Sequence, residues 1–500
     1  MKLTKFVKLL LVCAPCLLIS ACTGDSETNN TAETEEQKVV LVCEAENGSF
    51  NGNVHAGSSK SGFSGEGYAE GFEEDGDSAS ITVDIEEDGF YDLTFSSMGF
   101  GGYKENYVDV DDERIGCFPS EGDAFTDASL SRIFLTKGQH VVKVSKYWGY
   151  IALDKLTVMT SKELPADYFE YSAKLSNPNA SDNAKRVMSF LADEYGKHFL
   201  SGQNCDGGLY GHENACLWKA TGKFPAVLGL DMIEYSPSRA ENGSVGRSID
   251  YAKEAWEAGA IVTMCWHWNA PSKYLTGVWY SGFYQEHTNI DLDKIMNGED
   301  EEGYNLLISD MDAIAAELTK LKDEDVPILW RPLHEASGGW FWWGHCKSES
   351  YIKLYRLMYD KFVNEYELNN LIWLWNGQDP EWYPGDDVVD LVGTDIYPGE
   401  KVYTSQFSTY DETRNSAGGK KMVVLSENGC LFDPELAKRD GAMWGFWCTW
   451  GGEFVTNSKT YNTLSEQYTE EYMVKKVYED ENVLTLDELP DLEAYPIREE

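Results

Sequence analysis

The chain has 500 residues, of which 42% are hydrophobic and 13% aromatic, and its 41 Lys and Arg against 85 Asp and Glu give a net charge of −44. Because single domains rarely grow beyond about 300 residues, this length predicts more than one core. So acidic a surface repels a phosphate backbone and argues against a nucleic-acid partner. The 16 Trp and 29 Tyr favour an uncharged ligand with flat apolar faces, such as a sugar.

The first 21 residues have the pattern of an export signal: a basic start, then a short apolar run that ends in small residues. The run is shorter than the roughly 20 residues that a permanent bilayer helix needs. Ile19-Ser20-Ala21-Cys22 resembles a bacterial lipobox. We therefore expect cleavage before Cys22, a lipid on this residue, a flexible polar tether over residues 22–37, and a lipoprotein anchored in the membrane, most simply the outer membrane. The alternative is an ordinary secretory peptide.

Eight cysteines follow Cys22, and export permits disulfides among them. Cys205 and Cys216 flank a short Gly-rich loop and are the pair that we favour; Cys43 with Cys117 is a second candidate pair. After the signal there is no CxxC or HExxH spacing, so the sequence does not predict a zinc site.

Residues 38–160 contain short runs of alternating polarity, separated by Gly and acidic turns, which predict an all-β sandwich. This stretch resembles carbohydrate-binding modules of family 35 in its opening EAEN, in SGFSGEGYAEGF from Ser61, and in WGYIALDKLTV from Trp148. The resemblance implies a structural calcium ion held by Glu44, Glu46 and Asp154, and the alternative is a solvated acidic edge. Trp148 is the best candidate for an aromatic sugar platform, unless it belongs to the core.

A polar segment, residues 161–184, links this sandwich to a second domain over residues 185–490. There, eight apolar runs alternate with amphipathic helical stretches, which predicts an α/β fold, a closed (β/α)8 TIM barrel. The runs are HFLSGQ, FPAVLGLDM, AIVTMCWHW, VPILWRPLHE, NLIWLWNG, VDLVGTDIY, KMVVLSENG and WGFWCTWGG. Each run has its polar residues at the carboxyl end, where such barrels build active sites.

Two of these strand ends present carboxylates, Glu335 on the fourth run and Glu427 on the seventh. In a closed barrel of eight strands these positions face each other across the mouth. Two carboxyl groups about 5 to 5.5 Å apart are what glycoside cleavage with retention requires, one as the nucleophile and the other as the acid and then the base. Two unpaired glutamates buried for structure alone would be costly.

The second domain resembles glycoside hydrolase family 26, above all in RPLHEASGGWFWWG from Arg331, and also in LSGQ, TGKFPAVLGLD, WHWNAP, GTDIYP and LSENG. The resemblance implies that Glu335 is the acid/base and Glu427 the nucleophile. It also implies that His267, His334 and Trp340 line the subsite around the scissile bond. Tyr397 is then a hydrogen-bond donor to the nucleophile, and Trp450 a platform beneath the sugar.

Other residues of these motifs receive weaker expectations. Arg331 would supply positive charge to the nucleophile, and Asp395 would orient a neighbour. Asp231 and Gln203 also end apolar runs, but the sequence assigns them no contact. Of the four aromatics 340–343 we expect about half to be core, and we expect Trp373 and Trp375 to fill the barrel.

The HEASGGWFWWG form is most similar to β-mannanases, so we expect a retaining mannan endo-1,4-β-mannosidase that acts on mannan, glucomannan or galactomannan. A β-1,3-xylanase or a mixed-linkage β-glucanase of the same family is the alternative within the class. A non-catalytic surface glycan-binding lipoprotein is the alternative outside it. We expect no cofactor for catalysis, and a monomer whose partners are the polysaccharide and, through the lipid on Cys22, the membrane.

Overall fold

The computed structural model describes residues 37–460 and 462–498. The expected signal peptide, Cys22 and nearly all of the tether lie outside the described residues. Within the described ranges, no helix combines the length and the apolar character needed to cross a membrane.

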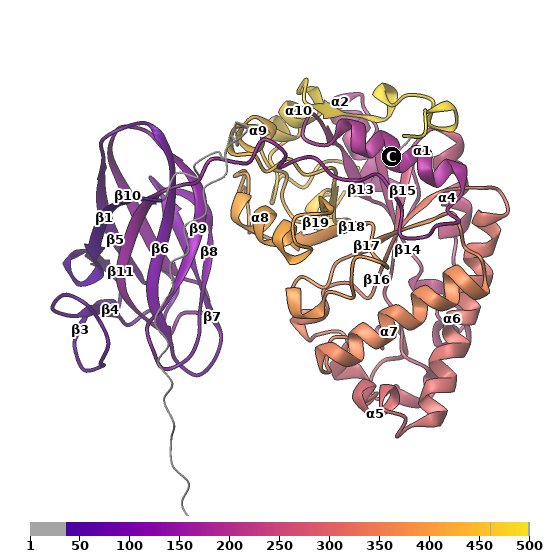
Figure 1. The fold of residues 1–500 in the computed structure, drawn as a ribbon, viewed down its shortest axis with the longest axis horizontal. Coiled ribbons are helices and arrows are strands. Elements are labelled where there is room, and N and C mark those ends of the chain that lie inside the picture. The colour runs from indigo at the N-terminus through magenta and orange to yellow at the C-terminus, as the bar shows by residue number, and fades with distance from the viewer. Residues whose placement is uncertain (1–36, 461, 499–500) are drawn as a thin grey trace, which may run out of the picture. The chain divides into compact units, whose positions relative to one another are not determined.

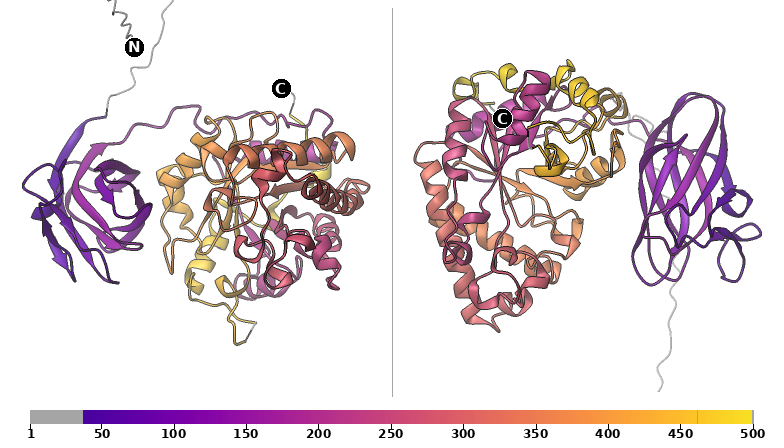
Figure 2. Two further views of the ribbon diagram at one scale, coloured as in Figure 1. Left: turned by 90° about the horizontal axis from the view of Figure 1, so that it is seen from below. Right: turned by 180° about the vertical axis from the view of Figure 1, so that it is seen from behind.

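The N-terminal domain is an all-β sandwich, as the alternating runs predict. One sheet has the order β3-β4-β11-β6-β9, with β1 also paired to β11, and the other has the order β2-β5-β10-β7-β8. The two sheets face each other (Figures 1 and 2). Inward side chains from both sheets form one apolar core. The strands are β1 (Val39–Glu44), β2 (Ser49–Asn51), β3 (His55–Gly57), β4 (Tyr68–Glu70), β5 (Ser78–Ile85), β6 (Gly89–Gly99), β7 (Lys104–Val110), β8 (Glu113–Ser120), β9 (Thr126–Leu135), β10 (Gly138–Lys146) and β11 (Ile151–Thr160).

The second domain is a closed barrel of eight parallel strands, β13 to β20, and each of the eight predicted runs supplies one of them. These strands are buried on both sides because helices cover the outside of the barrel, which is why they read as continuous apolar runs (Figure 1). The strands are β13 (Gly202–Asn204), β14 (Val227–Asp231), β15 (Ile261–Trp266), β16 (Ile328–Pro332), β17 (Leu371–Trp375), β18 (Leu391–Ile396), β19 (Met422–Asn428) and β20 (Trp447–Thr449). Short strands β12 (Phe199–Leu200) and β21 (Val483–Leu484) pair with each other.

Ten α-helices lie among the described residues, most of them between successive barrel strands as the alternating pattern predicts. Side-chain caps start several of them: the Ser181 hydroxyl accepts from Ala184 N–H at the start of α1, and Asp300 accepts from Gly303 N–H at the start of α6. The helices are α1 (Asp182–Glu194), α2 (His212–Thr221), α3 (Pro237–Ala240), α4 (Ser248–Glu257), α5 (Leu292–Met296), α6 (Glu301–Lys322), α7 (Ser348–Asp360), α8 (Phe407–Ser416), α9 (Pro434–Asp440) and α10 (Glu471–Glu479).

Large aromatic side chains fill the barrel domain. Trp330, Trp373, Trp375 and Trp447 are all fully buried, so the expectation that Trp373 and Trp375 are core is confirmed. The rings of Trp330 and Trp373 both contact Phe362, and Trp373 also contacts Tyr355 of α7, so these side chains pack between the strands and the outer helices. Polar side chains gather at the carboxyl ends of the strands, where such barrels build active sites.

The favoured disulfide is not present. All eight described cysteines are free thiols. The Cys205 thiol donates to Oε2 of Glu213 at 3.1 Å and packs over the start of α2, whereas Cys216 lies further along that helix. The second candidate pair is also unbridged: Cys43 on β1 and Cys117 on β8 are both free thiols.

Candidate active site

The carboxyl ends of β16, β18 and β19 bring the charged residues of the barrel together. Arg331 lies on β16 and Glu335 just beyond it, Asp395 is on β18, and Glu427 is on β19. An oxygen of Glu335, one of Asp395 and one of Glu427 lie within 4.8 Å of one another. The structure therefore places the two glutamates as close as the sequence predicts.

The chain bends sharply where it presents Glu335. Leu333 and Glu335 both have left-handed backbone angles, with φ of 53° and 52°, an arrangement that costs about 1 to 3 kcal/mol per residue. Neighbouring groups stabilise the bend: the backbone N–H of Glu335 donates to Asn376 O at 2.7 Å, and the Trp343 indole donates to His334 O at 2.8 Å. The strain is therefore tied to the presentation of one carboxyl group.

Glu335 has few groups that favour its charged form. Burial, the largest cause, and the nearby charges of Asp395 and Glu427 together raise its pKa to about 9. The Trp340 indole donates to Oε2 of Glu335 at 2.8 Å, which acts in the opposite direction. Glu335 is therefore protonated at neutral pH and can donate that proton.

Glu427 is more deeply buried than Glu335 but has strong donors. A guanidinium nitrogen of Arg331 donates to Oε1, and the Tyr397 hydroxyl donates to Oε2 at 2.7 Å. Burial is the largest cause and leaves the pKa of Glu427 above its usual value, while the charge of Arg331 and the hydrogen bond from Tyr397 lower it and favour the carboxylate. Arg331 also donates to Oδ2 of Asp395 at 3.0 Å, so that one guanidinium spans two carboxylates.

A hydrogen-bonded scaffold orients Asp395. Its Oδ1 accepts from Asn376 Nδ2 at 2.7 Å and from the Ser426 hydroxyl at 2.8 Å. Asp395 therefore orients its neighbour Arg331 and is itself held by β17 and β19. The sequence analysis did not single out Asn376 or Ser426, and their only signal is a place at the polar end of an apolar run.

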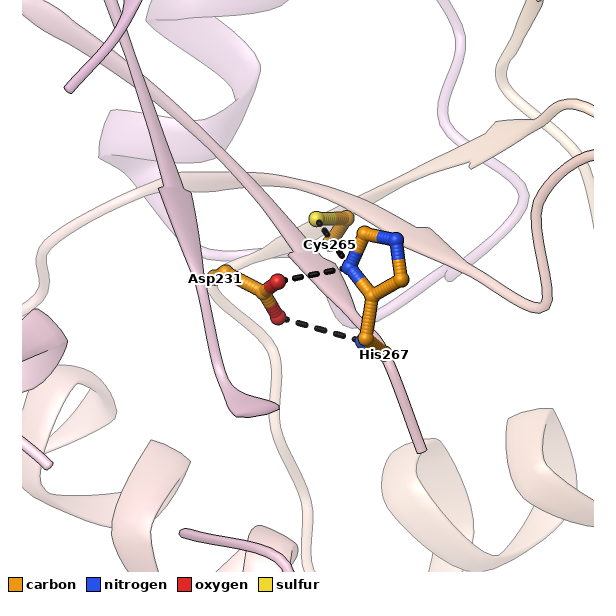
Figure 3. A group of neighbouring side chains, drawn as sticks. All are labelled: Asp231, Cys265 and His267. Carbon is orange, nitrogen blue, oxygen red and sulfur yellow. Dashed lines mark hydrogen bonds and ion pairs between the residues drawn. The ribbon is translucent and has the colours of Figure 1, made fainter. Parts of the chain in front are cut away.

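Two histidines lie beside the carboxylates. Nε2 of His267, which follows β15, is 3.1 Å from Nε2 of His334. Nδ1 of His267 donates to Oδ2 of Asp231 at 2.6 Å, as Figure 3 shows. Asp231, which the sequence left without a contact, is thus a partner of His267.

Aromatic rings border this site. Trp340 is 46% exposed, and the ring of Trp450 lies 5.8 Å from that of His267, edge to face. The expectation that half of residues 340–343 are core is wrong, because Phe341, Trp342 and Trp343 are all buried. These residues form a turn rather than a strand, so their side chains do not alternate between two faces.

Comparisons with known proteins agree with this geometry. Residues 176–488 match the family described as glycosyl hydrolase family 26, and residues 41–161 match carbohydrate binding module family 35. The chain belongs to glycosyl hydrolase family 26. A mannan endo-1,4-beta-mannosidase of Thermothelomyces thermophilus is 34% identical over 482 residues, 94% of each chain.

Two solved structures are similar to this family 26 protein. A Podospora anserina GH26-CBM35 beta-(1,4)-mannanase has a TM-score of 0.64 and 32% identity, and the match covers 91% of this chain and 99% of the other. A beta-mannanase from a symbiotic protist of the termite Reticulitermes speratus, complexed with gluco-manno-oligosaccharide, has a TM-score of 0.58 and 32% identity. That match covers 65% of this chain and 99% of the other.

The family 35 module carries an aromatic group on its own surface. Trp148 is 49% exposed and so does not belong to the core. Its ring contacts Tyr103 edge to face at 5.8 Å and lies 6.3 Å from Tyr147. Trp148 therefore lies beside two other aromatic rings on the surface of the module.

The acids predicted to bind calcium surround one loop of the module. Glu44 and Asp154 both accept from Ser64, at distances between 2.8 and 3.2 Å, and Oε1 of Glu46 accepts from the backbone N–H of Glu66 at 2.7 Å. Oε2 of Glu46 is buried and has no hydrogen-bond partner among the described residues.

Gln203 in the family 26 domain has a structural contact. Its side-chain amide donates to the backbone oxygens of Asn204 at 2.8 Å and Thr449 at 2.9 Å. It thereby ties the first barrel strand to the last, and we assign it to closure of the barrel.

Proposed function

We propose that this chain hydrolyses β-1,4-mannosidic linkages of mannan, glucomannan or galactomannan with retention of configuration. The observation that carries the proposal is the pair of carboxyl groups with oxygens within 4.8 Å, a protonated Glu335 and a Glu427 with two donors. This spacing suits a nucleophile that attacks directly and leaves no room for a water molecule between Glu427 and the anomeric carbon. The mannanase relatives support the choice of sugar.

In the first step, Oε of Glu427 bonds to the anomeric carbon while Glu335 gives its proton to the departing glycosidic oxygen. In the second step, Glu335, now a carboxylate, takes a proton from water, which attacks the anomeric carbon and releases Glu427. Arg331 and Tyr397 hold Glu427 ionised and aimed. The indole of Trp340 stabilises Glu335 in its carboxylate form between the steps.

Around the bond that breaks, we assign His267, His334 and Trp340 to the walls of the subsite and Trp450 to its floor. Aromatic faces pack on the apolar C–H faces of a pyranose, which suits the indole rings of Trp340 and Trp450. The half-exposed ring of Trp340 suits such a contact.

The test is hydrolysis of mannan, galactomannan, β-1,3-xylan and mixed-linkage β-glucan, with products separated by size and the first anomer followed by NMR. We expect preferential cleavage of the mannans and a β anomer as the first product. Cleavage of xylan or mixed-linkage glucan alone would move the assignment to that sugar, and an α anomer would contradict retention. Binding without cleavage of any polymer would identify a non-catalytic glycan binder.

We propose that the sandwich binds the same polysaccharide through Trp148, Tyr103 and Tyr147. These three rings lie together on one surface, and each is more than 40% exposed, which suits stacking on sugars. A Trp148→Ala variant tests this through its retention on insoluble mannan.

We also propose a structural calcium ion held by Glu44, Glu46 and Asp154. The unpartnered, buried Oε2 of Glu46 and the convergence of Glu44 and Asp154 fit a hard cation with oxygen ligands. The Lys155 ammonium lies 3.7 Å from Oδ2 of Asp154 and would be displaced. Calcium should raise the melting temperature of the wild type but not that of Asp154→Asn; equal shifts would contradict the site.

For localisation, we propose a monomeric bacterial lipoprotein of the outer membrane, anchored by a lipid on Cys22. The basic start, the short apolar run and the lipobox-like residues support this proposal. Mass spectrometry of the mature N-terminus should find a diacylglyceryl group on Cys22. An unmodified N-terminus would contradict the anchor, and a dimer in sedimentation would contradict the monomer.

A further inference from the structure

Asp231, the last residue of β14, makes contacts that the reaction steps above do not use. Its Oδ2 accepts from Nδ1 of His267 at 2.6 Å, and its Oδ1 accepts from the backbone N–H of His267 at 3.1 Å (Figure 3). Oδ1 also accepts from the backbone N–H of Ile233 at 2.9 Å, which fixes the carboxylate itself. These bonds set the plane of the imidazole ring and place a proton on its Nδ1.

The other ring nitrogen of His267 shares a proton with His334. The two Nε2 atoms are 3.1 Å apart, and a hydrogen bond between them needs one donor and one acceptor. Burial lowers the pKa of His334 well below its usual range, and Arg331 and His267 lower it further. Burial also lowers the pKa of His267, but the carboxylate of Asp231 raises it by more, so the net pKa lies above the usual value. The shared proton therefore belongs to His267.

Charged and titratable groups face His267 from several strands: Asp206, Asp231, Cys265, Arg331, His334 and Glu427. Glu427 raises the pKa of His267 and Arg331 lowers it, whereas His267 in turn lowers the pKa of Glu427. Sγ of Cys265 is 3.9 Å from Nδ1, but burial raises the pKa of this thiol far above its usual value. Cys265 is therefore neutral, and the partner of the imidazole is Asp231.

We propose that Asp231 is a positioning residue for hydrolysis: it holds His267 as an imidazolium ion that donates to His334 and places a positive charge beside Glu427. This role rests on the proposed function, in which Glu427 must be ionised to attack the sugar. A positive charge beside Glu427 disfavours its protonation, so the buried nucleophile stays ionised at lower pH. His334 remains neutral, and it adds no charge beside Glu335, which must keep its proton.

Asp231→Asn tests the role because it keeps the size of the side chain and an accepting oxygen but removes the charge. Without that charge His267 becomes neutral and Glu427 is harder to ionise. We expect the acidic limb of kcat/KM to move upward by about one pH unit, which is about a tenfold loss on that limb, with kcat affected more than KM. Asp231→Glu, which restores the charge, should move the limb back towards the wild type.

The matched control is Asp310→Asn. Asp310 is a buried carboxyl group on α6 that accepts from the indole of Trp268, the neighbour of His267, at 2.8 Å. Asp310→Asn makes the same chemical change, a carboxyl group to an amide, in another buried side chain that accepts a hydrogen bond from a ring. We expect it to leave the acidic limb of kcat/KM at the wild-type pH. If the acidic limb of kcat/KM for Asp231→Asn lay at the same pH as the limbs of the wild type and Asp310→Asn, Asp231 would have only a structural role.

Nitrogen NMR of the histidine rings gives a readout that does not depend on activity. The chain has only eight His, so 15N-histidine labelling gives few signals, and loss of one in His267→Gln assigns it. In the wild type at pH 6 we expect both nitrogens of His267 to carry protons and Nε2 of His334 to carry none. A neutral His267 would overturn the proposal, even if Asp231→Asn failed to fold. If the wild type were inactive on mannan, the proposed function would be refuted. The NMR spectrum would still show whether His267 is an imidazolium ion.

Discussion

Replacing Tyr397 by Phe should make Glu427 harder to ionise. The Tyr397 hydroxyl donates to Oε2 of Glu427 at 2.7 Å, while Arg331 holds Oε1. A hydrogen bond to a charged group contributes about 1.5 to 3 kcal/mol, and one pKa unit corresponds to about 1.4 kcal/mol. Because the hydroxyl favours the ionised form, its loss raises the pKa of Glu427 by about one to two units. Arg331 remains, so the carboxylate is weakened rather than lost.

The assay is kcat/KM on a soluble mannan from pH 4 to 9, because this profile reports the ionisation of the free enzyme. We expect the acidic limb of Tyr397→Phe to lie about one to two pH units higher, which is about a ten- to hundredfold loss on that limb. The control is Tyr366→Phe, because the Tyr366 hydroxyl also donates to a carboxylate at 2.7 Å, that of Asp312 on α6. If the acidic limbs of kcat/KM for Tyr397→Phe and Tyr366→Phe lay at the same pH, the role of the Tyr397 hydroxyl in keeping Glu427 ionised would be refuted.

Three further variants test the assigned roles. Glu427→Ala should abolish turnover, and azide should restore part of it as an inverted glycosyl azide; an active Glu427→Ala without azide would contradict a nucleophile at this position. Glu335→Ala should still form the glycosyl-enzyme quickly from substrates with good leaving groups but release it slowly, so equal losses on activated and natural substrates would contradict the acid/base role. Trp148→Ala should weaken retention on insoluble mannan and leave hydrolysis of soluble oligosaccharides unchanged; a loss of the latter would indicate a structural role instead.

The fold was predictable because burial leaves a direct trace in the sequence. β15 is buried on both sides and reads as a continuous apolar run, whereas β5 is buried on one side over most of its length and alternates. The turn at residues 340–343 leaves no such trace: the ring of Phe341, for example, packs against Phe283 and Tyr284, which are far away in sequence. An expectation based on alternation therefore failed there.

The positions of Glu335 and Glu427 were predictable because each ends an apolar run and the resemblance to family 26 names them. Their supporting contacts were not, because these depend on register. Between β18 and β19 the register shifts after Thr394, so that Asp395 pairs with Glu427 rather than with Ser426. Asp395 then meets Asn376 of the preceding strand end and the Ser426 hydroxyl together. A one-residue irregularity of this kind has no signature in composition or periodicity.

The acidity of the whole chain says little about this site, where the balance of charge is local. Three carboxyl groups lie within 4.8 Å of one another, and Arg331 bonds two of them, Asp395 and Glu427. Three adjacent negative charges in a buried site would repel one another strongly, so the group without the guanidinium, Glu335, is the one that keeps a proton. In the mechanism that we propose, the placement of one guanidinium therefore decides which glutamate is the acid and which is the nucleophile.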